Sequence, residues 1–226
     1  MKKAIGLVLI LALLMLSAAA LAEGNTVTAL GTATVSLVPD MASFSVGITT
    51  QDALITTAQS ANTAAMQSVI DALLALGIVR EDMQTDYYSV YPVYSYETTT
   101  PAVTGYEVSN TVTVIVRDLA QLPSLLDAAV EAGANNVYSL NFQSSEQPVA
   151  YEQAMKAAAQ DALRKAALMA QAIGREAGET LSLTEISSAN NIYYDVRAYA
   201  MDSSMTPIEG GLLSVSAEVQ AIVEMK

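Results

Sequence analysis

Carboxylates are the side chains with which this sequence could perform acid–base chemistry. The 226-residue chain has 23 Asp and Glu residues, but no His and no Cys. Zinc and copper sites built on imidazole or thiolate are therefore excluded, and so are Ser-His-Asp and Cys-His catalysis. A hydrolase or lyase would have to work with Asp and Glu pairs alone. We expect a non-catalytic protein without a cofactor, and keep a carboxylate-dependent hydrolase or lyase as the alternative.

Two groups of carboxylates are candidate ligand sites, and their sequence context favours a structural role for both. Asp40 follows Pro39 between two predicted strands, which is typical of a turn. Glu81, Asp82 and Asp86 form an acidic cluster after the first predicted helix, and carboxylate oxygens suit calcium. Their spacing lacks the D-x-[DN]-x-[DN]-G pattern of a calcium loop. We therefore expect no metal at either place.

Tyrosines gather on one predicted β-hairpin. Its arms at 87–96 and 105–117 are β-rich, and the polar segment 97–102 joins them. Rings occur at both strand parities, so one core face cannot cover them all. Tyrosine favours half-buried strands, but it also supplies rigid contact area at protein interfaces; a ligand-stacking platform is a third interpretation. The candidate interface residues are Tyr87, Tyr88, Tyr91, Tyr94, Tyr96 and Tyr106.

Two methionines are candidates for oxidation. Met201 and Met205 fall in the long predicted loop from Ser188 to Gly211, and exposed thioethers oxidise readily. Passive scavenging of oxidants by these two residues is an alternative to the core-filling role that explains most methionines. A loop of this length is more often functional or mobile than ordinary.

The first 22 residues predict a signal peptide. Lys2 and Lys3 precede an apolar run, and the segment ends in the small-residue pattern Ala20-Leu21-Ala22. We expect cleavage after Ala22, which leaves residues 23–226 as an exported chain with no stable membrane anchor. Its location would be periplasmic or extracellular, depending on the envelope of the host.

The charge of the mature chain argues against nucleic acid as a partner. Removal of Lys2 and Lys3 leaves 8 basic and 23 acidic residues, a formal charge of −15. Such a chain repels a phosphate backbone. An acidic surface also keeps an exported protein soluble, and a cationic partner is the alternative explanation.

Hydrophobic periodicity predicts an α+β fold with the order ββ-α-ββ-α-β-α-ββ. We expect a largely antiparallel sheet with helices packed mainly on one face, in which the first two strands pair with each other. The predicted helices run from Asp52 to Gly77, from Asp118 to Gly133 and from about Pro148 to Gly174. The predicted strands lie at residues 26–35, 42–49, 87–96, 105–117, 138–142, 180–187 and 213–225.

Alanine dominates the apolar stripe of the last predicted helix, so its backbone should approach the sheet closely. Glu152 with Lys156, and Asp161 with Lys165, would form i,i+4 ion pairs on the solvent side of this helix. The predicted buried stripe consists of Met155, Ala158, Ala162, Ala166, Met169 and Ile173.

Short pieces spread over nearly the whole mature chain carry a family resemblance through their order and spacing. Prominent among them are Gly31, Pro39-Asp40, Gly77-Ile78, Tyr91-Pro92, Gly105-Tyr106, Asn110, Arg117-Asp118, Gly133-Ala134, Lys165-Ala166 and Val215-Ser216-Ala217-Glu218-Val219. Together they resemble the SIMPL-domain family, a group of mostly bacterial exported proteins that includes periplasmic immunogenic and oxidative-stress-defence members.

The resemblance implies one SIMPL-like α+β domain over residues 23–226 that assembles into homo-oligomers, ring-like or channel-like. It implies no catalytic residues. We therefore expect a self-assembling protein of the cell envelope or exterior, linked to stress protection and able to meet an envelope protein partner. A surface adhesin or antigen is a further alternative.

Overall fold

The computed structural model describes residues 25–97, 100–186, 192–195 and 208–226. Met201, Met205 and the predicted signal peptide lie outside the described residues. The chain divides into two compact units. The first unit contains residues 25–35, 149–186 and 215–226, and the second contains residues 36–148 with the segment around 208–214. A single SIMPL-like domain over residues 23–226 stays a prediction.

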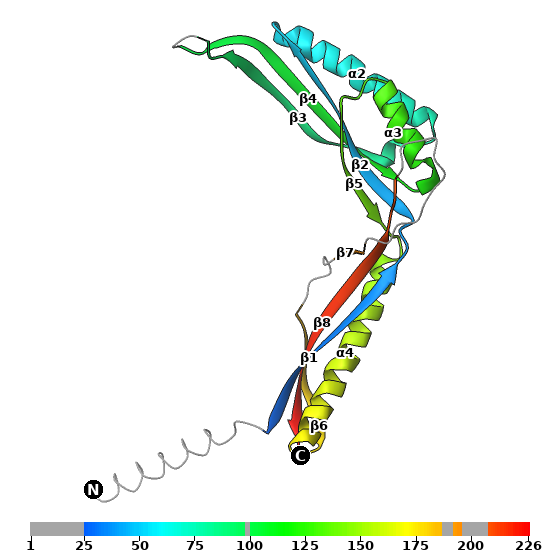
Figure 1. The fold of residues 1–226 in the computed structure, drawn as a ribbon, viewed down its shortest axis with the longest axis vertical. Helices are drawn as coiled ribbons and strands as arrows, with labels where there is room; N and C mark the ends of the chain where they lie inside the picture. Colours follow the sequence, from blue (N-terminus) through cyan, green and yellow to red (C-terminus); the bar gives the residue numbers. More distant parts are fainter. Residues whose placement is uncertain (1–24, 98–99, 187–191, 196–207) are drawn as a thin grey trace, which may run out of the picture. The chain divides into compact units, whose positions relative to one another are not determined.

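The predicted α+β class and element order are confirmed. The strands form two antiparallel sheets, and a four-residue strand, β7, is added before the last one. In chain order (Figure 1) the described elements are β1 (Thr26–Leu37), β2 (Met41–Asp52), α2 (Ile55–Ala75), η1 (Arg80–Asp82), β3 (Met83–Ser95), β4 (Ala102–Val116), η2 (Leu119–Gln121), α3 (Leu122–Glu131), β5 (Asn136–Gln143), α4 (Gln147–Ala172), β6 (Ala177–Glu185), β7 (Ile192–Asp195) and β8 (Leu212–Met225).

The prediction that the first two strands pair with each other is wrong. β1 belongs to the sheet with the order β1-β8-β6, in which β7 also pairs with β8, whereas β2 belongs to the sheet β3-β4-β2-β5. Both strands alternate apolar and polar residues, and alternation alone does not specify the partner. The size of the buried side chains separates them: β2 buries Phe44 and Ile48, whereas β1 buries Val27 and Ala29.

The second unit is built on the sheet β3-β4-β2-β5, and α2 and α3 cover one of its faces (Figure 1). Because side chains alternate across a strand, every second residue of β2 and β4 points under these helices. On β4 the residues of this side include Val108, Val112, Val114 and Val116, which are all buried. The opposite face of the sheet carries mostly polar residues, and we call it the open face.

One buried polar side chain ties α2 to this sheet. Asn62 is only 1% exposed, and its Nδ2 donates to the carbonyl oxygens of Ile48 on β2 (2.8 Å) and Val108 on β4 (2.9 Å). α2 then ends at Gly77, where φ is +95° and Ile78 N–H donates to Leu73 O. Glycine suits this left-handed helix end, as it does at Gly133 after α3.

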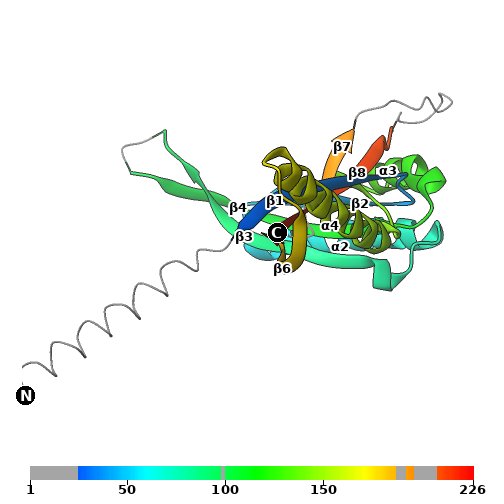
Figure 2. The same cartoon turned by 90° about the horizontal axis from the view of Figure 1, so that it is seen from below.

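The first unit packs a single helix, α4, on the sheet β1-β8-β6 (Figure 2). The buried residues of α4 are six alanines at a strict spacing of four: Ala150, Ala154, Ala158, Ala162, Ala166 and Ala170. The predicted stripe is therefore correct at its centre and wrong at its C-terminal end, where Met169 is exposed and Ile173 is 63% exposed. The sheet residues that pack against these alanines are themselves alanine and valine, so the row of alanines on α4 can lie flat on the sheet.

Gly31 of β1 is the point of closest approach between helix and sheet. A Cβ atom at Gly31 would lie 2.0 Å from Ala158 O and 2.2 Å from Ala162 N, both of them backbone atoms of α4. Contacts this short do not occur between unbonded atoms, so only glycine fits. The predicted close approach of the α4 backbone is thus confirmed.

The ion pair of Asp161 and Lys165 on α4 also bonds to the backbone of β1. Their side chains are 2.7 Å apart, Asp161 also accepts the Thr32 N–H (3.2 Å), and Lys165 donates to Leu30 O (2.9 Å). Bonds to Lys165, Arg164 and the Thr32 N–H hold the pKa of Asp161 well below its usual range. We call this pair the edge clamp, because β1 is an edge strand of its sheet.

The substitution Gly31→Ala should destabilise the first unit. The added methyl must push α4 away from β1 or distort the strand, and overpacking of this kind costs about 1 to 3 kcal/mol or more. Urea unfolding followed by circular dichroism would measure the loss. Thr32→Val, an exposed neighbour on β1, should change the unfolding free energy by less than about 0.5 kcal/mol. Equal stability of Gly31→Ala and wild type would contradict the packing described here.

Candidate functional site

The tyrosine hairpin consists of β3 and β4, as predicted. The two strands pair antiparallel from Met83 opposite Val114 to Ser95 opposite Ala102. Near its base the hairpin is part of the sheet, because β4 also pairs with β2. That pairing stops where Asp52 lies opposite Tyr106. Beyond Tyr106 the two strands pair only with each other, and no further strand of the described residues joins the hairpin end.

Strand register distributes the tyrosines over both faces of the sheet. Tyr88 lies opposite Asn110, on the side of α2, and its hydroxyl accepts a hydrogen bond from Gln59 of that helix (3.2 Å). Tyr87 and Tyr91 have the other parity and lie on the open face. The prediction that one core face cannot cover all of the rings is therefore confirmed, while an interface role for them stays a prediction.

The hairpin end carries the most exposed ring of the hairpin. Tyr96 is 76% exposed, and its ring centroid lies 6.4 Å from that of Tyr94 with the rings tilted by 45°. Val103, opposite Tyr94, is exposed as well. Tyr87, Tyr88 and Tyr91 are at least as exposed as Tyr94, and Tyr106 is half-buried. Residues 98 and 99 of the connecting turn are outside the described residues.

A seventh tyrosine, Tyr138 of β5, joins the open face, and sequence reasoning identified it only as a strand residue. Its hydroxyl donates to Thr111 of β4 (3.3 Å), so the side chain crosses β2 at Gly47, the residue that pairs with Thr111. A Cβ at Gly47 would lie 3.0 Å from Thr111 Oγ1. Only the cross-strand register reveals this arrangement, because Tyr138 and Thr111 are 27 residues apart.

The phenols of the open face contact one another through hydroxyl groups. Hydrogen bonds to Ser89 and to Tyr91 lower the pKa of Tyr87, and the bond to Tyr87 raises the pKa of Tyr91. Tyr138 bonds to Thr111, which lies opposite Tyr87 on β4, so the three phenols occupy neighbouring positions on the open face. This face can stack on a partner and exchange hydrogen bonds with it.

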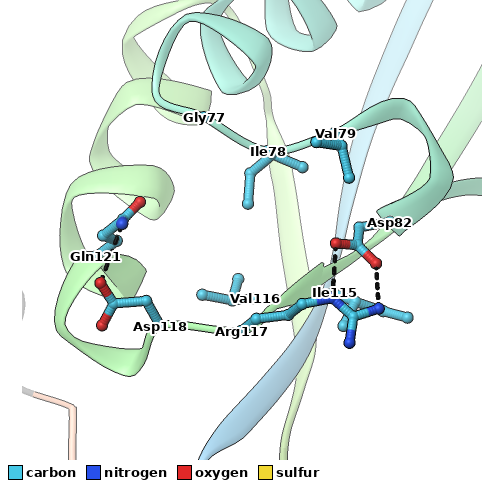
Figure 3. A pocket seen from close by; sticks show the side chains of 9 residues that line it. All are labelled: Gly77, Ile78, Val79, Asp82, Ile115, Val116, Arg117, Asp118 and Gln121. Atoms are coloured by element: carbon cyan, nitrogen blue, oxygen red, sulfur yellow. Dashed lines mark hydrogen bonds and ion pairs between the residues drawn. The ribbon is translucent and has the colours of Figure 1, made fainter.

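Two carboxylates line a second feature, a hollow of about 270 Å³ between the end of α2 and the end of β4 (Figure 3). Arg117 donates to Asp82 through both Nε (3.0 Å) and Nη2 (2.7 Å), a bidentate ion pair. Asp118 instead accepts the Ala120 N–H and the side-chain amide of Gln121. The expectation that Asp118 begins a helical segment is confirmed, since it caps η2.

The predicted acidic cluster does not converge on one point. Asp82 pairs with Arg117, whereas Asp86 accepts the Thr113 hydroxyl at 2.8 Å. In the part of the chain that the structure describes, no three acidic side chains form a group that could hold a metal ion. None of the described helices is long and apolar enough to cross a membrane.

Asp40 has a structural partner. It accepts the Ser145 N–H at 2.8 Å and also the Ser145 hydroxyl, which joins the turn before β2 to the segment that follows β5. These bonds lower the pKa of Asp40, and the bonds from Arg117 lower that of Asp82. Carboxyl groups held ionised in this way are poor proton donors at neutral pH.

The substitution Asp82→Asn should lower the unfolding free energy at neutral pH. Because the folded pKa of Asp82 is depressed, the ion pair stabilises the fold above the ordinary carboxyl pKa of 3.8, and this contribution disappears as pH falls through the lower folded value. The gap between wild type and variant should therefore shrink between neutral pH and about pH 3, measured by urea unfolding. Arg117→Lys, which keeps the charge but not the bidentate geometry, should fall between them. A gap independent of pH would contradict this account.

Comparison with known proteins agrees with the resemblance drawn from the sequence. The model of the SIMPL family, described as a protein of unknown function (DUF541), matches residues 27–223. A 26 kDa periplasmic immunogenic protein of Brucella melitensis (biotype 1) is 32% identical over 200 residues, covering 83% of this chain and 80% of the relative. The uncharacterized protein YggE of Escherichia coli K12 is 30% identical over 164 residues, covering 72% and 66%.

Solved structures add no argument. An amidase of the hydantoinase/carbamoylase family from Burkholderia phymatum is 11% identical, covers 59% of this chain and 36% of its own, and has a TM-score of only 0.25. The family model and the two relatives, which span most of the described chain, decide the assignment. The chain belongs to the SIMPL (DUF541) family.

Proposed function

We propose that this is an exported, non-catalytic protein of the cell envelope that assembles with copies of itself through the tyrosine hairpin. The observation that carries the proposal is the hairpin end, where Tyr94, Tyr96 and Val103 are exposed and no third strand of the described residues joins β3 and β4. Tyrosine is enriched at protein interfaces, because it buries a large rigid ring and keeps a polar tip.

Export to the periplasm is supported by two independent observations. The sequence begins with the pattern of a signal peptide over residues 1–22. The similar protein from Brucella is named periplasmic. We therefore place the mature chain in the periplasm, or outside the cell where the host has no outer membrane. A role in stress protection rests on the family resemblance, and the proposed oxidation of Met201 and Met205 belongs with it.

A carboxylate-dependent hydrolase or lyase is the second candidate, and the hollow of Figure 3 is where it would operate. Asp82 and Asp118 both line this hollow. Each is engaged by its own donor, Arg117 or Gln121, and the pKa of Asp82 is lowered, whereas a general acid needs a raised one. These contacts favour the non-catalytic proposal. A surface antigen, as the name of the Brucella relative suggests for that protein, is compatible with exposed tyrosines.

Self-assembly predicts a particle larger than the monomer. Size-exclusion chromatography with light scattering on residues 23–226 should give a mass of several copies at micromolar concentration, decreasing on dilution. Replacing Tyr87, Tyr91, Tyr94 and Tyr96 together with Ser should reduce this mass towards one copy. The matched control is Leu168→Ser, which changes an exposed residue of α4 in the first unit. A strict monomer for the unsubstituted chain would remove the proposal.

A further inference from the structure

An apolar hollow lies at the end of the second unit from which β2 starts. It has a volume of about 280 Å³, and its lining is almost entirely apolar: Pro39, Leu119, Leu122, Pro123, Phe142 and Ile208. An apolar cavity of roughly half this volume is already large enough to bind a benzene ring. Val38, at its rim, is 73% exposed. The hollow therefore has the size and the chemistry for one aromatic side chain.

The same unit exposes aromatic side chains that are not packed. Tyr94 and Tyr96 project from the side of the hairpin end that continues the α2 face, because they share the parity of Tyr88 and Pro92 along β3. Their rings lie beside each other, and Tyr96 is the most exposed of the large side chains that we describe. Large exposed rings next to a polar tip are typical anchors of protein interfaces.

The hollow and the hairpin end cannot meet within one copy. Phe142, which lines the hollow, pairs with the residue next to Met41, whereas β2 ends ten residues later at Asp52, opposite Tyr106. Tyr94 lies opposite Val103, three residues further out. At about 3.3 Å per residue the two features are roughly 40 Å apart along the strands. Figure 1 shows the end of β5 and the tip of the β3–β4 hairpin at opposite ends of the sheet.

We propose that the hairpin end of one copy docks on the apolar hollow beside Phe142 of a second copy, with the ring of Tyr96 in the hollow and Tyr94 against its rim. This inference rests on the proposed self-assembly and names the contact that produces it. The contact is heterologous, since different surfaces of the two copies meet, and such contacts repeat from copy to copy until the ring closes or a filament grows. Each copy then contributes one hairpin end and one hollow.

Negative charges on both surfaces oppose the contact, and they predict how assembly depends on salt concentration. Glu97 follows Tyr96 at the hairpin end, and Asp40, Asp118 and Glu209 adjoin residues that line the hollow. Carboxylates on both sides repel each other. Salt weakens this repulsion, since the Debye length falls to about 10 Å at 0.1 M. Assembly driven by apolar burial against this repulsion should strengthen as salt rises from about 0.01 M to 0.15 M. Ion pairing would give the opposite dependence.

The test uses one variant for each side of the contact. The hairpin variant carries Tyr94→Ser with Tyr96→Ser, and the hollow variant carries Val38→Asp, at exposed positions that leave the core untouched. Their matched controls are Leu168→Ser on α4 and Val130→Asp on α3. Sedimentation velocity of residues 23–226, at concentrations up to about 100 µM, would measure the mass, and circular dichroism would verify folding.

We expect each variant alone to be a monomer under conditions where wild type and both controls assemble. A mixture of the two variants should form a dimer and stop there, because it contains only one intact hairpin end and one intact hollow per pair. A monomeric mixture would overturn the proposal, and so would variants that assemble like wild type. A Val38→Asp variant that is less stable but still assembles would mean that a segment of the same copy occupies the hollow. That outcome would also overturn the proposal. A monomeric wild type would instead remove the proposed function itself.

Discussion

Direct contact between the backbones of α4 and β1 is the constraint on which the first unit depends. Gly31 leaves no room for a side chain against Ala158 and Ala162, so the helix axis lies as near to the sheet as two backbones allow. The six-alanine ridge keeps this distance along the helix. Because α4 lies so close, Asp161 and Lys165 reach the backbone of the edge strand. Larger residues in the ridge would lift both of them away.

In the second unit, side-chain size and polarity depend on the face of the sheet, because helices cover only one face. Bulky residues such as Phe44 and Ile48 fill the covered side, and Asn62 satisfies two carbonyl groups there. The open face is left to hydroxyls that bond to one another, for example Ser45 to Thr113. Rings placed on this face, or on the hairpin end beyond the helices, have no core to enter. Their exposure is a consequence of the architecture.

Sequence patterns predicted what depends on local periodicity. Apolar residues alternate along β4 and β8, and Val112, Val114, Val116 and the odd positions of β8 from 213 to 223 are buried. Gly77 and Gly133 end helices because glycine tolerates positive φ. Periodicity did not reveal partners distant in the chain, such as Asp82 with Arg117, Tyr138 with Thr111, or β1 with β8. These long-range partners depend on the strand register and on the sheet that each strand joins. The local spacing of residues determines neither.

The edge clamp has a consequence for how this protein can associate. A strand at the margin of a sheet offers unpaired amide and carbonyl groups to any passing chain, and such margins are templates for aggregation. In β1 the groups at Leu30 and Thr32, midway along the strand, are already bonded to Lys165 and Asp161. An incoming strand would have to displace a charged pair to continue the sheet. Extension of this sheet by a second chain is thus opposed at β1.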